Sequence, residues 1–107
     1  MSTNRNRRPT HPGAVLREDV LPGLGVTQRG FAERLGVSRQ TLNGVLCERT
    51  PVSTDLAHRL GRLRGTSPEV WVGMQRDVDL WDALQENRET YERIRPLGAA
   101  VAHGPGG

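Results

Sequence analysis

Apolar residues recur at helical spacing in two short segments between residues 27 and 46, one on each side of a glycine. These positions are Phe31, Ala32 and Leu35 in the first segment and Leu42, Val45 and Leu46 in the second. Gly36 can adopt the positive φ that a sharp turn between two helices requires. Thr27 is predicted to cap the first of these helices. Ser38 is a good N-cap for the second, which would begin with its free N–H groups exposed.

This pattern predicts a helix-turn-helix, a motif whose second helix enters the major groove of DNA. The alternative is an ordinary hairpin of two helices inside a small bundle. Such a hairpin would not need polar side chains at the start of its second helix, where this chain has Arg39 and Gln40.

Helical spacing also predicts a first helix from Pro12 to about Leu21, preceded by Thr10 or His11 as its cap. We expect Val15, Leu16 and Val20 to be its buried residues. The segment 22–25, Pro-Gly-Leu-Gly, is expected to break the helix, after which Leu24 and Val26 would return to the core.

Two more helices are predicted after the helix-turn-helix. Ser53 caps one of them, which ends at Gly65, and Ser67 caps a long one that runs from Pro68 to about Arg93. The apolar stripe of the former is Leu56, Ala57, Leu60 and Leu63. Together the pattern predicts an all-α fold of five helices, with a flexible basic arm at residues 1–11, a helical domain at 12–95 and a disordered tail at 96–107.

The long last helix carries residues at alternating spacings of three and four, close to a heptad seam. They are Trp71, Met74, Val78, Trp81 and Gln85. Two interpretations stay open. The first four form a homodimer interface, or the two tryptophans complete the core of the single chain.

Charge supports a polyanionic partner. The chain of 107 residues is one domain's worth, with a formal charge of +3 and a pI near 10.4. Residues 1–50 hold eight Arg and four acids, whereas residues 51–107 hold seven Arg and eight acids, so the positive charge accompanies the helix-turn-helix. All 15 basic residues are Arg, which is typical of a GC-rich genome and says little about guanine recognition.

Seven polar residues are predicted to contact DNA: Gln28, Ser38, Arg39, Gln40, Thr41, Asn43 and Arg49. Arg39 and Gln40 begin the second helix of the motif and would point into the groove, where Arg pairs with guanine and Gln with adenine. Asn43 lies one turn further along the same face.

The other predicted contacts are mainly to the DNA backbone. Gln28 begins the preceding helix, where its amide and nearby N–H groups can hold a phosphate. Thr41 could meet a phosphate or a thymine methyl group, and Arg49 follows the helix within reach of the backbone. Gly44 has no side chain for base contacts and permits a close backbone approach.

No catalytic, cofactor or metal site is predicted. His11, His58 and His103 are scattered, the Gly23-Leu24-Gly25 segment lacks the third glycine and the preceding strand of a dinucleotide fingerprint, and Cys47 is the only cysteine. We expect Cys47 to be a partly buried small residue and His58 to lie on the surface. The opening residues lack an apolar stretch and no segment could span a bilayer, so a cytoplasmic location in a bacterium is expected, on the nucleoid when DNA is bound.

Several segments outside the helix-turn-helix, and one within it, resemble the HigA family of antitoxins. They are residues 11–16 (His-Pro-Gly-Ala-Val-Leu), 35–42 (Leu-Gly-Val-Ser-Arg-Gln-Thr-Leu), 49–53 (Arg-Thr-Pro-Val-Ser) and 65–71 (Gly-Thr-Ser-Pro-Glu-Val-Trp), with Gln75 and 79–81 (Asp-Leu-Trp). The resemblance implies a lambda-repressor-like fold of the XRE type. It also implies a dimeric repressor that binds the operator of its own operon and neutralises a co-encoded, mRNA-cleaving HigB-like toxin.

By that resemblance, Gln28, Arg39, Gln40 and Asn43 match DNA-facing positions. The chain departs from the family at residues 47–48, where Cys-Glu replaces a frequent Asn-Gly, and an acid there would repel phosphates mildly. The toxin-binding surface is not a short motif, so the arm, the first helix and the tail all stay open. A stand-alone XRE-type regulator without a toxin is the alternative function, and a protein-interaction module that has lost DNA binding is a third.

Overall fold

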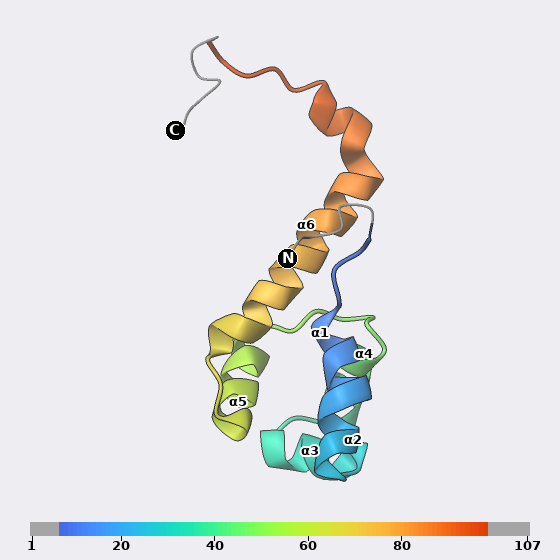
Figure 1. The fold of residues 1–107 in the computed structure, drawn as a ribbon, viewed down its shortest axis with the longest axis vertical. Helices are drawn as coiled ribbons and strands as arrows, with labels where there is room; N and C mark the ends of the chain where they lie inside the picture. The colour runs from blue at the N-terminus through green and yellow to red at the C-terminus, as the bar shows by residue number, and fades with distance from the viewer. Residues whose placement is uncertain (1–6, 99–107) are drawn as a thin grey trace.

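The structure is a computed structural model that describes residues 7–98, and these residues form helices and no strand (Figure 1). The elements are α1 (Pro12–Val15), η1 (Leu16–Val20), α2 (Leu21–Leu24), α3 (Gln28–Leu35), α4 (Arg39–Leu46), α5 (Thr54–Arg64) and α6 (Pro68–Glu92). Since α1, η1 and α2 are consecutive segments of one helix, the described residues hold five helices. The predicted all-α fold of five helices is confirmed. None of these helices has the length and apolar composition needed to cross a membrane.

Local capping signals set the start of each later helix as predicted. In each case the side-chain oxygen of the N-cap accepts a backbone N–H from the first turn, which would otherwise lack a partner. The pairs are Thr27 with Gly30 (3.0 Å), Ser38 with Thr41 (3.0 Å), Ser53 with Leu56 (3.1 Å) and Ser67 with Glu69 (3.0 Å). Gly36, between α3 and α4, adopts the left-handed conformation with φ 77°.

The first helix does not break at Pro22, as the sequence suggested, but continues to Leu24. Its middle segment, η1, is a π-helix in which the N–H of Leu21 bonds to the carbonyl of Leu16, five residues back. In a regular α-helix the Pro22 ring would meet the carbonyl four residues before it, and the wider turn relieves that clash. The helix ends one turn later at Gly25, with φ 68°.

The core lies where the first helix, α3, α4 and α5 meet, and it contains the residues predicted for the helix-turn-helix. Its fully buried side chains include Leu16, Phe31, Leu42 and Leu60. Two predicted core residues lie elsewhere: Leu24 is 46% exposed and Leu63 is 37% exposed, each at the last turn of its helix. Val26 is only partly buried against the core.

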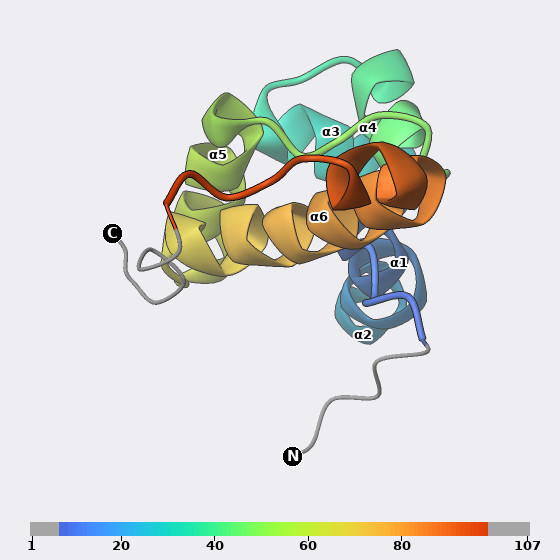
Figure 2. The ribbon, with the colours of Figure 1, turned by 90° about the horizontal axis from the view of Figure 1, so that it is seen from above.

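Helix α6 packs on α5 and then extends beyond the rest of the domain (Figures 1 and 2). Its first half faces the core with Trp71 (4% exposed) and Val78 (1% exposed). The helix ends at Glu92, one residue before the predicted end, and Asn87 has non-helical angles that kink it.

Of the predicted arm at residues 1–11, residues 1–6 lie outside the described residues. Residues 7–11 run alongside α6, and His11 is 4% exposed and caps α1 (Figure 1). This part of the predicted arm therefore packs against the domain. Of the predicted tail at 96–107, residues 96–98 are non-helical and residues 99–107 lie outside the described part of the chain.

Candidate nucleic-acid interface

The start of α4 presents polar side chains to solvent while the opposite face of the helix is buried. Leu42, Val45 and Leu46 are at most 5% exposed and hold α4 against the core. Arg39 and Gln40, the first two residues of α4, are exposed. The amphipathic division predicted from sequence thus puts the free end of α4 where a groove of DNA could receive it.

Four of the predicted contact residues surround one shallow hollow. It is lined by Gln28 from the start of α3 and by Arg39, Gln40 and Asn43 from α4. The Gln28 side-chain amide donates to Asn43 Oδ1 at 3.0 Å, and this hydrogen bond joins α3 to α4. We refer to these four residues as the polar front. The sequence predicted each member, but not the hydrogen bond between Gln28 and Asn43.

Three further predicted residues flank the polar front. Ser38 accepts the N–H of Thr41, and its own hydroxyl donates to Thr41 Oγ1 at 2.8 Å. Thr41 is exposed, with its Oγ1 already in contact with the cap. Arg49 is exposed beyond the end of α4, and its contact with a phosphate stays a prediction.

The turn after α4 has an unusual residue at its key position. Glu48 adopts the left-handed conformation with φ 62°, which glycine or asparagine usually takes at the end of a helix. The N–H of Glu48 bonds to the carbonyl of Val45, and that of Arg49 to the carbonyl of Gly44. These two bonds form a Schellman motif. Gly44 allows it to close, because a Cβ there would lie 2.8 Å from Thr50 Oγ1.

The sequence suggested that Glu48 would repel phosphates mildly, but in the structure its carboxylate is paired with two arginines. Its carboxylate accepts from Arg8 at 3.2 Å and from Arg17 at 3.3 Å. Arg8 also makes two hydrogen bonds of 2.8 Å to Asp82 on α6, and these lower the pKa of that carboxyl. Arg17 donates to the last carbonyl of α4, that of Leu46, at 2.7 Å. The carboxylate of Glu48 is therefore paired, and its repulsion toward phosphates is reduced.

His11 lies beside these ion pairs and caps the first helix. Its Nδ1 accepts the N–H of Gly13 at 2.9 Å, so the ring is held in its neutral form as the cap of α1. Burial lowers the pKa of His11, because a charged imidazolium would be poorly solvated there. The sequence left Thr10 and His11 as candidates for this cap, and the cap is His11. Its burial was not predicted, because His11 was also counted in the flexible arm.

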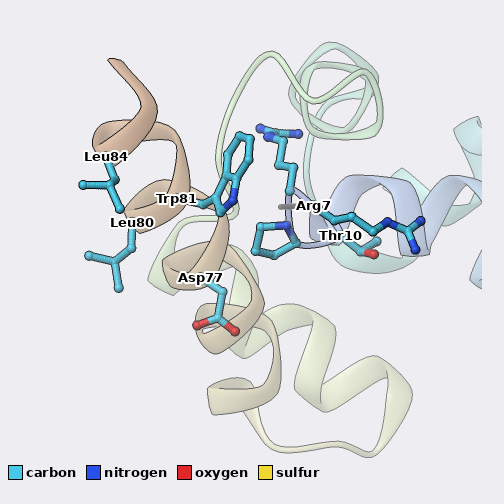
Figure 3. Close-up of a pocket in the computed structure, with 8 residues that line it drawn as sticks. Arg7, Thr10, Asp77, Leu80, Trp81 and Leu84 are labelled. Atoms are coloured by element: carbon cyan, nitrogen blue, oxygen red, sulfur yellow. The ribbon is translucent and has the colours of Figure 1, made fainter. Parts of the chain in front are cut away.

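The four residues predicted to form a dimer interface do not lie together on an exposed surface. Trp71 and Val78 are buried within the single chain, and the Trp71 N–H donates to Thr66 Oγ1 at 3.1 Å. Met74 is partly buried against the core. Trp81 turns toward Arg7, and together with Leu80 and Leu84 it lines a hollow between α6 and residues 7–10 (Figure 3). Trp71 and Val78 are thus core residues and cannot form a dimer surface.

The sequence also predicted how far Cys47 and His58 would be exposed. Cys47 is exposed, in contrast to the partial burial expected, and His58 is exposed as expected. Within residues 7–98, no three His, Cys, Asp or Glu side chains stand close enough to hold a metal ion together.

A short turn between two helices, with a buried back and an exposed polar front on the second helix, defines a helix-turn-helix protein of the DNA-binding type. The chain is 32% identical over 91 residues to Antitoxin HigA-1 of Vibrio cholerae, an alignment that covers 85% of this chain and 86% of that protein. The chain therefore belongs to the HigA family of antitoxins, as its sequence segments indicated.

Other similarities agree with this assignment. An uncharacterised HTH-type transcriptional regulator of Haemophilus influenzae is 32% identical over 95 residues, covering 89% of this chain and 88% of that protein. The Pseudomonas aeruginosa antitoxin HigA, solved with the higBA promoter, superposes with a TM-score of 0.80 at 36% identity, covering 85% of this chain and 100% of that one. Antitoxin GraA in complex with its operator gives 0.79 at 36% identity, covering 92% and 99%. No protein-family model matches the chain.

Proposed function

We propose that this chain is the antitoxin of a type II toxin–antitoxin module, which binds operator DNA as a dimer to repress its own operon and neutralises a co-encoded HigB-like toxin. The observation that carries the DNA-binding part is the polar front. Gln28, Arg39, Gln40 and Asn43 converge on one side of α4, whose other side is buried. Promoter or operator DNA in the solved structures of two similar antitoxins supports this part.

Base recognition is assigned to Arg39 and Gln40, and phosphate contact to Gln28, Thr41 and Arg49. The free N–H groups at the start of α4 add to the attraction for phosphates. Each well-placed side chain that pairs with a base edge discriminates by about 1–3 kcal/mol, so a single α4 helix reads only a few bases. Two copies on a palindromic operator would supply the missing specificity.

The decisive experiment is a mobility shift on DNA from upstream of the chain's own gene, with unrelated DNA as competitor. Arg39→Ala combined with Gln40→Ala should remove the preference for the operator while leaving weak non-specific binding. Arg62→Ala combined with Gln85→Ala deletes the same two kinds of side chain from exposed positions on α5 and α6 and should leave the preference intact. If the wild-type chain fails to shift its own upstream DNA even at low salt, the chain is a protein-interaction module instead.

Toxin neutralisation is tested by co-expression with the neighbouring gene, scored by rescue of growth and by co-purification. We expect the Arg39→Ala, Gln40→Ala variant to rescue growth as well as the wild type does, because we assign the polar front to DNA and not to the toxin. Loss of rescue in that variant, once it is shown to be folded, would mean that the two functions share a surface.

A stand-alone regulator is the second candidate. It is favoured by the similar Haemophilus influenzae protein, which is described only as an HTH-type transcriptional regulator. DNA binding by this chain, together with the absence of a short neighbouring gene whose product it neutralises, would select this candidate over the antitoxin.

A further inference from the structure

The amide of Asn43 is held in one orientation by two donors. Gln28 Nε2 donates to Asn43 Oδ1 at 3.0 Å, and the Cys47 thiol lies 3.7 Å from the same oxygen. An amide oxygen accepts two hydrogen bonds, so these neighbours fill it. Within residues 7–98 no hydrogen bond uses Asn43 Nδ2, and this group is left for the hollow that Asn43 shares with Arg39 and Gln40.

Cys47 favours one of the two orientations that the pair of amides could adopt. The pair of Gln28 and Asn43 alone could exchange donor and acceptor by turning both amides over. The Cys47 thiol donates to Asn43 Oδ1 at 3.7 Å, which adds one weak bond to the orientation that has the oxygen of Asn43 on the side of Cys47.

We infer that Asn43 recognises its base as a hydrogen-bond donor only, and therefore selects guanine over adenine. This inference rests on the proposed DNA binding. An unrestrained Asn pairs with adenine through both its oxygen and its nitrogen, which match N7 and N6. With its oxygen occupied, Asn43 offers only N–H groups. Guanine presents two adjacent acceptors, N7 and O6. Adenine presents one acceptor, N7, and a donor at N6 that would face the N–H groups of Asn43.

Gln28 is, on this view, a positioning residue that sets base preference through Asn43. Gln28→Ala removes the stronger of the two donors and leaves only the weak thiol donor to orient Asn43, so much of the preference for guanine over adenine is lost. Gln28→Glu has no N–H to offer, so Asn43 would turn to donate to the new carboxylate. Its oxygen would then face the groove and accept from adenine N6 or cytosine N4.

The test is selection of bound duplexes from a randomised library, with sequencing, for the wild type and each variant. Asn43→Ala locates the contacted base pair as the position at which preference disappears. There the wild type should prefer guanine over adenine by about tenfold. This ratio should fall toward one in Gln28→Ala and invert in Gln28→Glu. Gln85→Ala, the same truncation as Gln28→Ala but on the exposed face of α6, should keep the wild-type ratio.

Two results would overturn the inference while leaving DNA binding in place. One is a wild-type preference for adenine at the Asn43 position. The other is an unchanged guanine-to-adenine ratio in both Gln28 variants. By contrast, a wild-type chain that enriches no sequence would refute the proposed operator binding itself. Uniform repulsion of DNA by the carboxylate of Gln28→Glu lowers total binding but does not alter the ratio between bases.

Discussion

Gly13 allows the first helix to approach α4 more closely than any other residue would permit. A Cβ built at Gly13 would lie 1.9 Å from the carbonyl oxygen of Val45, which is backbone and cannot turn aside. Gly13 is therefore required by packing and not by a positive φ. Val45 belongs to the buried face of α4, so the close approach of Gly13 lies directly behind that face.

Gly13→Ala should lower the free energy of unfolding by about 1–3 kcal/mol or more, because α1 must move away from α4. Gly23→Ala is the matched control, since it adds the same methyl group to α2, where nothing lies within 4 Å. We expect the control to be neutral or to stabilise by up to about 1 kcal/mol. Urea unfolding of both variants checks this, and equal destabilisation of the two would refute the close packing.

His11 predicts a stability that depends on pH. Its pKa in the folded protein lies below the ordinary 6.5, mainly because of burial, with opposing effects from Glu48, Asp79 and Asp82 and a further lowering by Arg8. The unfolded chain therefore binds a proton at a higher pH than the folded one. Acidification through pH 6.5 favours unfolding, and the stability present at neutral pH is lost progressively as the pH falls toward the folded pKa.

We expect the melting temperature to fall between pH 7.5 and 5.5 in the wild type and to change less in His11→Asn. Asparagine is a good N-cap that does not titrate, so it keeps an acceptor for the Gly13 N–H. The depressed pKa of Asp82 acts at lower pH, below the ordinary 3.8 of that group, and does not enter this window. An equally steep dependence on pH in His11→Asn would assign the effect to another group.

At the scale of elements, α6 holds the loop between α4 and α5 through one buried side chain. Gln75, which is 6% exposed, accepts the N–H of Val52 at 2.8 Å and donates to Asp79 at 2.9 Å. Loss of this side chain would leave a buried backbone N–H without a partner. Such a group costs about 1–3 kcal/mol.

Gln75→Ala should therefore destabilise the domain by about 1–3 kcal/mol, and Gln85→Ala, on the exposed face of the same helix, by less than about 0.5 kcal/mol. Hydrogen exchange at the Val52 amide is the specific measurement, because it should accelerate in Gln75→Ala alone. If protection of that amide survives the substitution, the loop is held by other contacts.

Elements were predictable from sequence where their signals are local. The four N-caps and Gly36 act within a few residues, so the starts of α3, α4, α5 and α6 could be predicted. Pro22 misled the prediction because the rule that it breaks helices assumes an α-helical register, and a π-helical turn removes that assumption. Periodicity on α6 showed that Trp71 and Val78 share a face, but it does not state what covers that face.

The candidate site was predictable to the same extent. The polar front follows from the amphipathic pattern of one helix, so its members were found. The pairing of Gln28 with Asn43 and that of Arg8 with Glu48 and Asp82 were not found. The latter partners lie 40 and 74 residues away from Arg8, and only the folded chain brings them together.

At the scale of the molecule, Arg8 connects three parts of the chain. It joins residues 7–11 to the end of α4 through Glu48 and to α6 through Asp82. Exposed ion pairs contribute little singly, but two parallel bonds to one carboxylate fix geometry as well as adding energy. The position of α6 is thereby coupled to the end of the helix that carries the polar front. The spacing of two such helices in a dimer would depend on how α6 projects.

The dimer that we propose would use the exposed side of α6, because Trp71 and Val78 are buried in the single chain. Leu80 is 65% exposed and Leu84 is 40% exposed, and they lie four residues apart on one face of α6 (Figure 3). Leu80→Glu combined with Leu84→Glu should convert a dimer of twice 11.8 kDa into a monomer, measured by light scattering, and should weaken operator binding more than binding to a single half-site. Leu24→Glu, at a 46% exposed leucine on α2, is the control and should remain dimeric. A wild-type chain that is monomeric at the concentrations where it binds its operator, or a double variant that stays dimeric, would contradict this interface.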